Sequence, residues 1–269
     1  MPHLTLSGGN VHYRVAGTGQ PLVLLHANPG DSRDFDAISE TLAQRFQVYA
    51  LDWPGYGQST LTPDQPVDVG LYARCLREFL EALAMPPAIL LGNSVGGYAA
   101  ARVALDVPER VRALVLVAPG GFTPHNRMTR MFCRLQASRM ALSPYSFARL
   151  YLRTRSATVE AMLERARHEH AQPAARALNR ALWRSFGQPD SDLRAQAERI
   201  RVPTCLMFGA RDPAIPAHRD GRVARACLPQ AEYHVLPSGH APFAEIPALF
   251  LETLNPFLEG LAPASSGPQ

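Results

Sequence analysis

Hydrophobic residues follow two alternating patterns along this chain: short continuous runs, and stretches with an apolar residue every three or four positions. The continuous runs are typical of strands buried on both faces. They lie at residues 21–27, 46–53, 88–92 and 111–118. Helical spacing occupies the segments after them, at 34–46, at 69–84 and from Ser94 to about Pro108. Strands that alternate with helices predict an α/β protein with a parallel sheet and right-handed crossovers.

Other segments complete or interrupt this alternation. Residues 3–7 and 11–17, separated by Gly8-Gly9-Asn10, predict a hairpin at the N-terminus. Residues 123–199 have helical patterns with breaks at Pro144, Pro173 and Gly187–Pro189. The strand and helix patterns then resume at 204–212, 217–228, 231–236 and 243–261. We expect a core formed by residues 1–122 and 200–261, a helical cap at 123–199, and a disordered tail at 262–269.

The composition supports a globular protein with a large core. Of 269 residues, 46% are hydrophobic and 19% are charged, which argues against disorder. No stretch has the length of a transmembrane helix, and the first residues do not form a signal peptide. The four cysteines, Cys75, Cys133, Cys205 and Cys227, form neither a disulfide framework nor a C-x-x-C pair. We therefore expect a cytoplasmic protein without structural disulfides.

Charge is distributed unevenly along the chain. All 27 basic residues are arginine, and 14 of them lie in 123–199 against 6 acidic residues there. The net charge of that segment is +8, so the remaining residues carry −4 of the overall +4. No basic run with interleaved aromatic residues accompanies it, which argues against nucleic-acid binding. The sequence also shows no metal-binding cluster and no dinucleotide fingerprint, so we expect no metal and no cofactor.

A possible nucleophile lies directly after the strand at 88–92. Gly92-Asn93-Ser94-Val95-Gly96 fits the pattern G-x-S-x-G, and a helical segment begins at the serine. In a nucleophile elbow, this strand–turn–helix context holds the serine in a strained turn whose neighbours must lack bulk. The start of the helix also favours developing negative charge. We therefore predict that Ser94 is a catalytic nucleophile.

A serine nucleophile needs a base and an orienting acid, and both can be assigned from their positions. His240 lies between the last strand and the last helix, and Asp212 follows the strand before it. Both therefore come at the carboxyl edge of the sheet, where open α/β sheets place their active sites. The backbone N–H groups of Asn28 and Val95 are the expected oxyanion-hole donors. His26 is expected to brace the loop that contains Asn28.

With these motifs in order, the chain resembles the α/β-hydrolase superfamily over essentially its whole length. The resemblance rests on HANPG, DWPGYGQS, GNSVGG, GARDPAIP and GHAPFAEIP. It implies a mostly parallel eight-stranded sheet flanked by helices, with a helical cap inserted after the sixth strand. Ala27 departs from the family pattern, which has glycine at that position of the oxyanion loop.

The resemblance implies a serine hydrolase that cleaves a small carboxylic ester, thioester or lactone through an acyl-enzyme. The stretches VAPGGFTPHNRM and SFARLYLRTRSATVEAMLERARHEH partly resemble meta-cleavage-product C–C hydrolases, so hydrolysis of an acidic vinylogous diketone is an alternative. A non-catalytic ligand-binding protein of the same fold is a second alternative. The basic cap suggests that Arg165 and Arg167 bind a substrate carboxylate. The expected partner is a small molecule, and the sequence does not indicate an oligomeric state.

Overall fold

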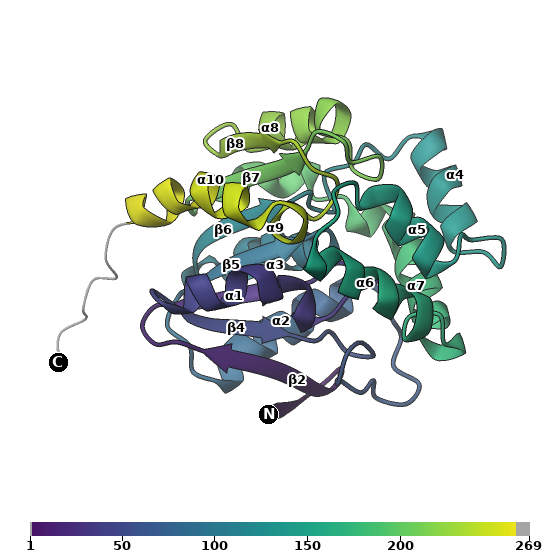
Figure 1. Ribbon diagram of the computed structural model, residues 1–269, viewed down its shortest axis with the longest axis horizontal. Helices are drawn as coiled ribbons and strands as arrows, with labels where there is room; N and C mark the ends of the chain where they lie inside the picture. Colours follow the sequence, from purple (N-terminus) through teal and green to yellow (C-terminus); the bar gives the residue numbers. More distant parts are fainter. Residues whose placement is uncertain (1, 262–269) are drawn as a thin grey trace.

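The computed structural model describes residues 2–261, which form one mixed sheet covered by helices on both faces (Figure 1). The expected tail at 262–269 lies outside the described residues. In these residues the sheet has eight strands in the order β1-β2-β4-β3-β5-β6-β7-β8. The strands are β1 (His3–Leu6), β2 (Gly9–Ala16), β3 (Pro21–Leu25), β4 (Gln47–Leu51), β5 (Ala88–Asn93), β6 (Val111–Val117), β7 (Thr204–Gly209) and β8 (Glu232–Leu236). Strand β2 runs antiparallel to β1 and β4, and the pairs from β4 to β8 are parallel.

The predicted elements have the expected types, with small shifts at their ends. The turn of the N-terminal hairpin lies at Ser7-Gly8, because β2 already begins at Gly9. The last expected helix is divided at Ile246 into α9 and α10, with Pro247 starting the second. The helices are α1 (Asp36–Ala43), α2 (Val69–Ala82), α3 (Val95–Asp106), α4 (Arg127–Gln136), α5 (Pro144–Tyr151), α6 (Ala157–His168), α7 (Pro173–Phe186), α8 (Arg222–Cys227), α9 (Pro242–Glu245) and α10 (Pro247–Gly260).

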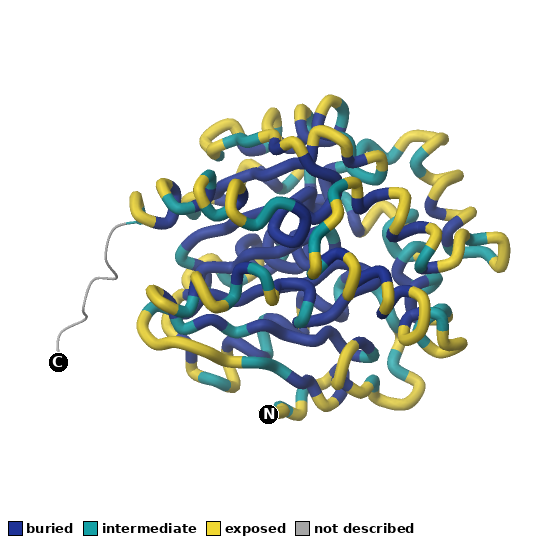
Figure 2. Tube along the Cα trace, viewed as in Figure 1, coloured by how far each residue is buried: buried dark blue, intermediate teal, exposed yellow. Residues whose placement is uncertain are grey.

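The continuous apolar strands build two cores because their side chains alternate between the faces of the sheet. Val23 and Leu25 of β3 pack in the core that contains α2 and α3. Leu22 and Leu24 pack in the other core, with α1, α9 and α10. Figure 2 shows the central strands as buried segments inside the molecule and the outer turns of the helices as exposed.

Four α-helices, α4–α7, lie between β6 and β7, in the segment where the cap was expected. Figure 1 shows them gathered at one end of the sheet. We call residues 123–199 the cap segment. Its helices contribute to both cores, with Leu178 and Leu182 of α7 in one and Phe147 of α5 in the other. None of the described helices has both the length and the apolar character needed to cross a membrane.

Candidate active site

Ser94 occupies a sharp turn between β5 and α3. Its backbone has φ 54° and ψ −112°, a conformation that a residue with a side chain rarely adopts. The neighbouring glycines explain how the turn fits. A Cβ atom on Gly92 would overlap the carbonyl oxygen of Gly96, and a Cβ atom on Gly96 would overlap that of Leu25. The small residues of the motif therefore allow β5, the turn and α3 to pack in direct backbone contact.

Hydrogen bonds fix the backbone of Ser94 on three sides. Its N–H donates to the carbonyl of Val117 at the end of β6, at 3.1 Å. Its own carbonyl accepts from the N–H groups of Tyr98, at 3.0 Å, and Gly120, at 2.8 Å. Strand β6, helix α3 and the loop after β6 therefore hold the turn in place. A strained backbone conformation persists only where the surrounding structure fixes it in this way.

Asp212 and His240 form a direct pair at the same edge of the sheet. His240 Nδ1 lies 2.6 Å from Asp212 Oδ2, and both residues are almost completely buried. The other carboxylate oxygen of Asp212 accepts from the N–H groups of Ala214, at 2.8 Å, and Ile215, at 3.2 Å. Asp212 is therefore oriented by the turn that follows it, and the imidazole of His240 is oriented by Asp212.

The pair shifts the pKa values of both members. Burial alone would lower the pKa of His240, but the Asp212 carboxylate and the charge of Glu245 more than compensate, so this pKa is raised. Burial would raise the pKa of Asp212, but the charge and hydrogen bond of His240 dominate and lower it. Asp212 is thus an acceptor for His240, and His240 is a proton acceptor at pH values above its raised pKa.

Asn93 connects the loop of His240 to the turn of Ser94. Its side-chain Nδ2 donates to the main-chain carbonyl of His240 at 3.1 Å and to that of Val117 at 3.0 Å. Since Asn93 directly precedes Ser94, this buried amide ties the histidine loop to the residue beside the serine. The sequence reasoning assigned no role to Asn93, the variable position of the serine motif.

Glu245 was also missed, although it holds the histidine loop in place. Its carboxylate is buried and accepts from the N–H groups of Gly239, at 2.8 Å, and Ala241, at 3.1 Å, on either side of His240. It also accepts from Arg153 and Thr154 of the cap segment, both at 2.8 Å. Four backbone donors therefore converge on one side chain. The signal in the sequence is an acid five residues after His240, within the segment 243–261 that was expected to form the last helix.

The expected oxyanion loop follows β3. Among the described residues, the N–H groups of Asn28 and Val95 donate to no protein acceptor. The side chain of Asn28 is engaged elsewhere: its Nδ2 donates to Asn179 Oδ1 at 2.8 Å, and its Oδ1 accepts from the hydroxyl of Tyr56. Helix α7, which contains Asn179, is thereby attached to the loop. The side chain of Asn28 is fixed while its backbone N–H stays available.

His26 braces the same loop, as expected. Its Nδ1 lies 2.7 Å from the carbonyl of Ala27, and its Nε2 accepts from the N–H of Trp53 at 3.0 Å. The ring is completely buried, which lowers its pKa. A neutral ring with a hydrogen on Nδ1 satisfies both contacts, so His26 is positioned to support the backbone and not to accept a proton from Ser94.

A cavity of about 250 Å³ opens at Ser94. Its walls combine the loop after β6, the turn after Asp212 and the helices α4 and α7 of the cap segment. The lining residues are Ser94, Gly120, Gly121, Thr123, His125, Met128, Thr129, Phe132, Cys133, Trp183, Phe186, Pro213, Ala214, Ile215 and Arg219. Most of these side chains are apolar. A small apolar group bound there would lie against the serine.

The two predicted carboxylate binders do not line this cavity, which corrects the expectation from the basic cap. Arg165 is buried, with Nη2 donating to Asp34 Oδ1 at 2.6 Å and Nε lying 3.1 Å from Asp31 Oδ2. Burial and the nearby Asp31 raise the pKa of Asp34. Arg167 is exposed, and its guanidinium lies 4.4 Å from the centre of the Tyr145 ring. Arg165 is therefore neutralised by the protein itself, because two aspartates already occupy its guanidinium.

The sequence reasoning missed the polar residues that do line the cavity. Arg219 is the one arginine among its described lining residues, and it pairs with Asp220 at 2.7 Å. His125 lines the cavity as well, with Nε2 3.4 Å from the hydroxyl of Ser191, and burial lowers its pKa. Neither position follows from a motif, because both depend on how the cap segment folds back over the sheet edge.

Comparison with known proteins identifies the family of this chain. A family model described as the alpha/beta hydrolase fold matches residues 20–247. The chain belongs to the α/β-hydrolase family. It is 31% identical to a pimeloyl-[acyl-carrier protein] methyl ester esterase of Nitrosomonas europaea, over 91% of this chain and 98% of that protein. The protein is therefore a hydrolase of this family, and its similarity to esterases supports hydrolysis of esters.

Two solved structures have the same fold. A hydrolase from Pseudomonas aeruginosa superimposes with a TM-score of 0.81 at 24% identity, covering 96% of this chain and 97% of that one. A thermophilic esterase from Thermogutta terrifontis has a TM-score of 0.80 at 22% identity, with coverage of 97% and 98%. At this level of identity, both similarities concern the fold alone.

Proposed function

We propose that this protein hydrolyses a carboxylic ester of a small apolar acyl group, with Ser94, His240 and Asp212 as its catalytic triad. The observation that carries the proposal is the strained Ser94 turn, which opens into the cavity while a buried Asp212–His240 pair lies at the same sheet edge. Strain of this kind persists in proteins mainly where function requires it.

The proposed reaction has two halves. Ser94 Oγ attacks the ester carbonyl while His240 Nε2 accepts its proton, and the tetrahedral oxyanion accepts hydrogen bonds from Asn28 N–H and Val95 N–H. His240 then donates the proton to the leaving alcohol, which leaves an acyl group on Ser94. A water molecule attacks this acyl-enzyme with His240 again as the base, and the carboxylic acid is released.

The cavity restricts which part of the substrate it can hold. Its volume of about 250 Å³ lies just below the range of roughly 300–1,000 Å³ that is typical of pockets for drug-sized ligands. Met128, Phe132 and Trp183 provide apolar walls, and Arg219, whose charge is paired with Asp220, lies at one side. We expect a short acyl chain with a neutral far end in this cavity.

Replacement of Ser94 by alanine tests the nucleophile. We expect kcat for a short-chain ester to fall by roughly 10³- to 10⁶-fold with an unchanged melting temperature, because only binding and oxyanion stabilisation would remain. A fluorophosphonate probe should label the unmodified protein at Ser94 and leave the variant unlabelled. Ser146→Ala, at an exposed position of α5, is the matched control. Full turnover in Ser94→Ala would refute the assignment.

A panel of substrates tested on the unmodified protein separates the proposal from the alternatives. A panel that includes short esters, thioesters, lactones and a vinylogous diketone should give its highest kcat/KM with an ester. Faster turnover of the diketone would favour a C–C hydrolase. Binding of panel compounds without any turnover would favour a non-catalytic binding protein.

The cap segment favours a more specific candidate within this function, an ester whose acyl chain is attached to an acyl-carrier protein. Residues 123–159 contain seven arginines and no acidic residue. Helix α4 exposes Arg130 and Arg134 beside the apolar Met131 and Leu135. Relatives about 30% identical are esterases of an acyl-carrier-protein ester. An acidic carrier could dock on this basic and apolar surface while its acyl chain enters the cavity.

Charge reversal on α4 tests this candidate. In Arg130→Glu/Arg134→Glu, we expect kcat/KM for a carrier-linked methyl ester to fall at least tenfold, while kcat/KM for the free methyl ester stays unchanged. Rising salt should weaken the carrier-linked reaction of the unmodified protein, because exposed charges are screened. Arg222→Glu, at an exposed position of α8, is the control. Equal effects on both substrates would exclude docking through α4.

A further inference from the structure

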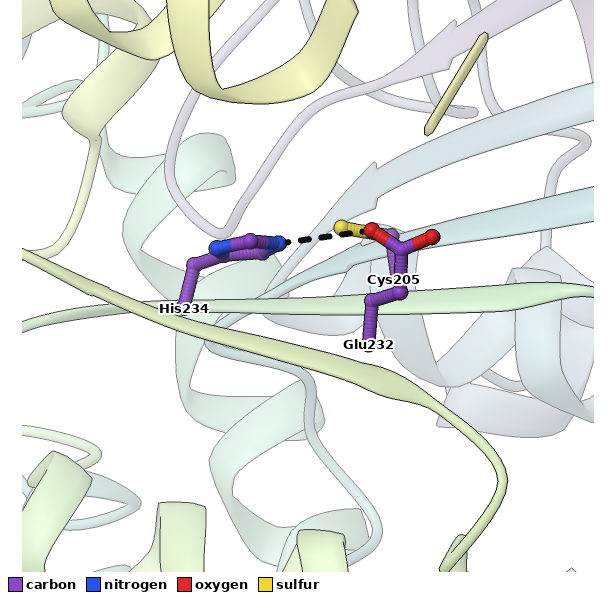
Figure 3. Close-up of side chains that lie close together, drawn as sticks. All are labelled: Cys205, Glu232 and His234. Atoms are coloured by element: carbon purple, nitrogen blue, oxygen red, sulfur yellow. Dashed lines mark ion pairs between the residues drawn. The ribbon is translucent and has the colours of Figure 1, made fainter. Parts of the chain in front are cut away.

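Three potential metal ligands from two neighbouring strands converge on one face of the sheet (Figure 3). Cys205 lies on β7, and Glu232 and His234 lie on β8. In the parallel register, Cys205 is paired with Glu232, and His234 follows two positions later on the same face. None of the three lines the cavity at Ser94. Their convergence thus results from strand register, and the widely spaced cysteines of the sequence give no sign of it.

The distances are close to those of a metal-binding geometry. His234 Nε2 lies 3.5 Å from Glu232 Oε2, and the ligand atoms of all three residues lie within 4.8 Å of one another. Zinc bonds of about 2.0–2.3 Å to nitrogen, oxygen and sulfur put the ligand atoms of a tetrahedral site roughly 3.3–3.7 Å apart. Small side-chain adjustments would therefore bring the three atoms around one ion.

His234 Nε2 provides a further observation. This atom is buried and makes no hydrogen bond to any described residue, and its contact with Glu232 Oε2, at 3.5 Å, is a long one. A buried polar atom without a hydrogen bond is unfavourable and calls for an explanation. Figure 3 shows the imidazole directed toward the carboxylate of Glu232 and the sulfur of Cys205. A metal ion between these groups would give Nε2 a direct bond in place of its long contact with Glu232.

We propose that Cys205, Glu232 and His234 bind a zinc ion. Sulfur, imidazole nitrogen and carboxylate oxygen together suit Zn²⁺, whereas Mg²⁺ and Ca²⁺ prefer oxygen ligands alone. On binding, the Zn–S bond replaces the S–H bond of Cys205, and the proton is released to the solvent. Water would complete the tetrahedron.

The ion would join the edge strand β8 to β7. These two strands lead into the loops of His240 and Asp212, so zinc would stabilise the part of the sheet that carries this pair. Stabilisation by a ligand that binds only the folded state grows with its concentration relative to Kd. We therefore expect the melting temperature to rise with added Zn²⁺ until the site is saturated.

Titration with Co²⁺ tests the ligands directly, because a thiolate bound to Co²⁺ produces a charge-transfer band in the near ultraviolet. We expect this band to saturate at one equivalent of Co²⁺ in tag-free protein and to disappear on addition of Zn²⁺. Cys205→Ala should abolish the band, and His234→Ala should weaken Co²⁺ binding by roughly 100-fold. Cys227→Ala and His218→Ala, which alter a half-buried cysteine and an exposed histidine, are the matched controls.

The outcomes decide the proposal even if one variant fails to fold. Because Cys205 is fully buried, Cys205→Ala is the more disruptive change, and the half-buried His234→Ala then carries the test. A band that survives at full strength in His234→Ala, or no thiolate band in the unmodified protein, would overturn the zinc site. The cluster would then be an ion pair between Glu232 and His234 beside a structural thiol. None of these readouts depends on hydrolase activity.

Discussion

Replacement of Glu245 by glutamine tests the role of the carboxylate that holds the His240 loop in place. The carboxylate accepts three N–H groups on Oε2, from Gly239, Arg153 and Thr154, and one on Oε1, from Ala241. Glutamine keeps one oxygen and replaces the other by an NH₂ group. In the better orientation, the oxygen keeps the three donors and the NH₂ group faces the N–H of Ala241.

The expected loss of stability follows from this geometry. One buried N–H without an acceptor costs about 1–3 kcal/mol, and the remaining hydrogen bonds lose the assistance of the negative charge. We expect a total of about 2–4 kcal/mol, which corresponds to a fall in melting temperature of roughly 5–15 °C. Glu259→Gln, an identical change at an exposed position of α10 that pairs with Arg45, should leave the melting temperature almost unchanged.

The pH profile supplies a second readout that a general loss of stability would not produce. His240 accepts a proton only when it is neutral, so kcat/KM should rise as the pH passes through its pKa. The Asp212 carboxylate and the charge of Glu245 both raise this pKa. Removing the Glu245 charge should therefore lower it and move the rise in kcat/KM to lower pH. A profile that stays in place, or moves to higher pH, would refute the role we assign to Glu245.

Three further changes test other parts of the structure. Asp212→Asn should lower kcat by about 10⁴-fold with little loss of folding, because the amide favours the wrong tautomer of His240; kinetics with circular dichroism as the folding control would show this. Arg165→Met should destabilise the protein by about 3–5 kcal/mol in denaturant melts at pH 7, because the buried Asp34 loses its charged partner and Asp31 keeps only Arg33; an unchanged midpoint would contradict it. Arg167→Ala is its exposed control. Gly96→Ala should prevent the elbow from packing and yield insoluble or strongly destabilised protein; a soluble variant with the original melting temperature would contradict this.

The sequence by itself determined the strands, the helices and their order. This was possible because the two periodicities are local: a strand buried on both faces needs a continuous apolar run, and a packed helix needs apolar residues three and four apart. The same locality explains the prediction of the Ser94 turn, since its glycines are two positions away on either side. Asp212 and His240 could be proposed from the sequence because each follows a strand, and parallel strands deliver their carboxyl ends to one edge of the sheet.

Only the tertiary structure decided which polar groups meet. The charge of Arg165 suggested a substrate carboxylate, but the guanidinium lies against Asp34, 131 positions earlier in the chain. Glu245 holds two backbone donors of its own loop and two of the distant cap segment, and Cys205 meets His234 through the register of β7 and β8. A charged side chain or a thiol can interact with many partners, so the residue type alone does not specify which partner it contacts in the folded protein. That choice is made by strand register and by the way the cap segment packs on the sheet edge, and both depend on contacts across the whole chain.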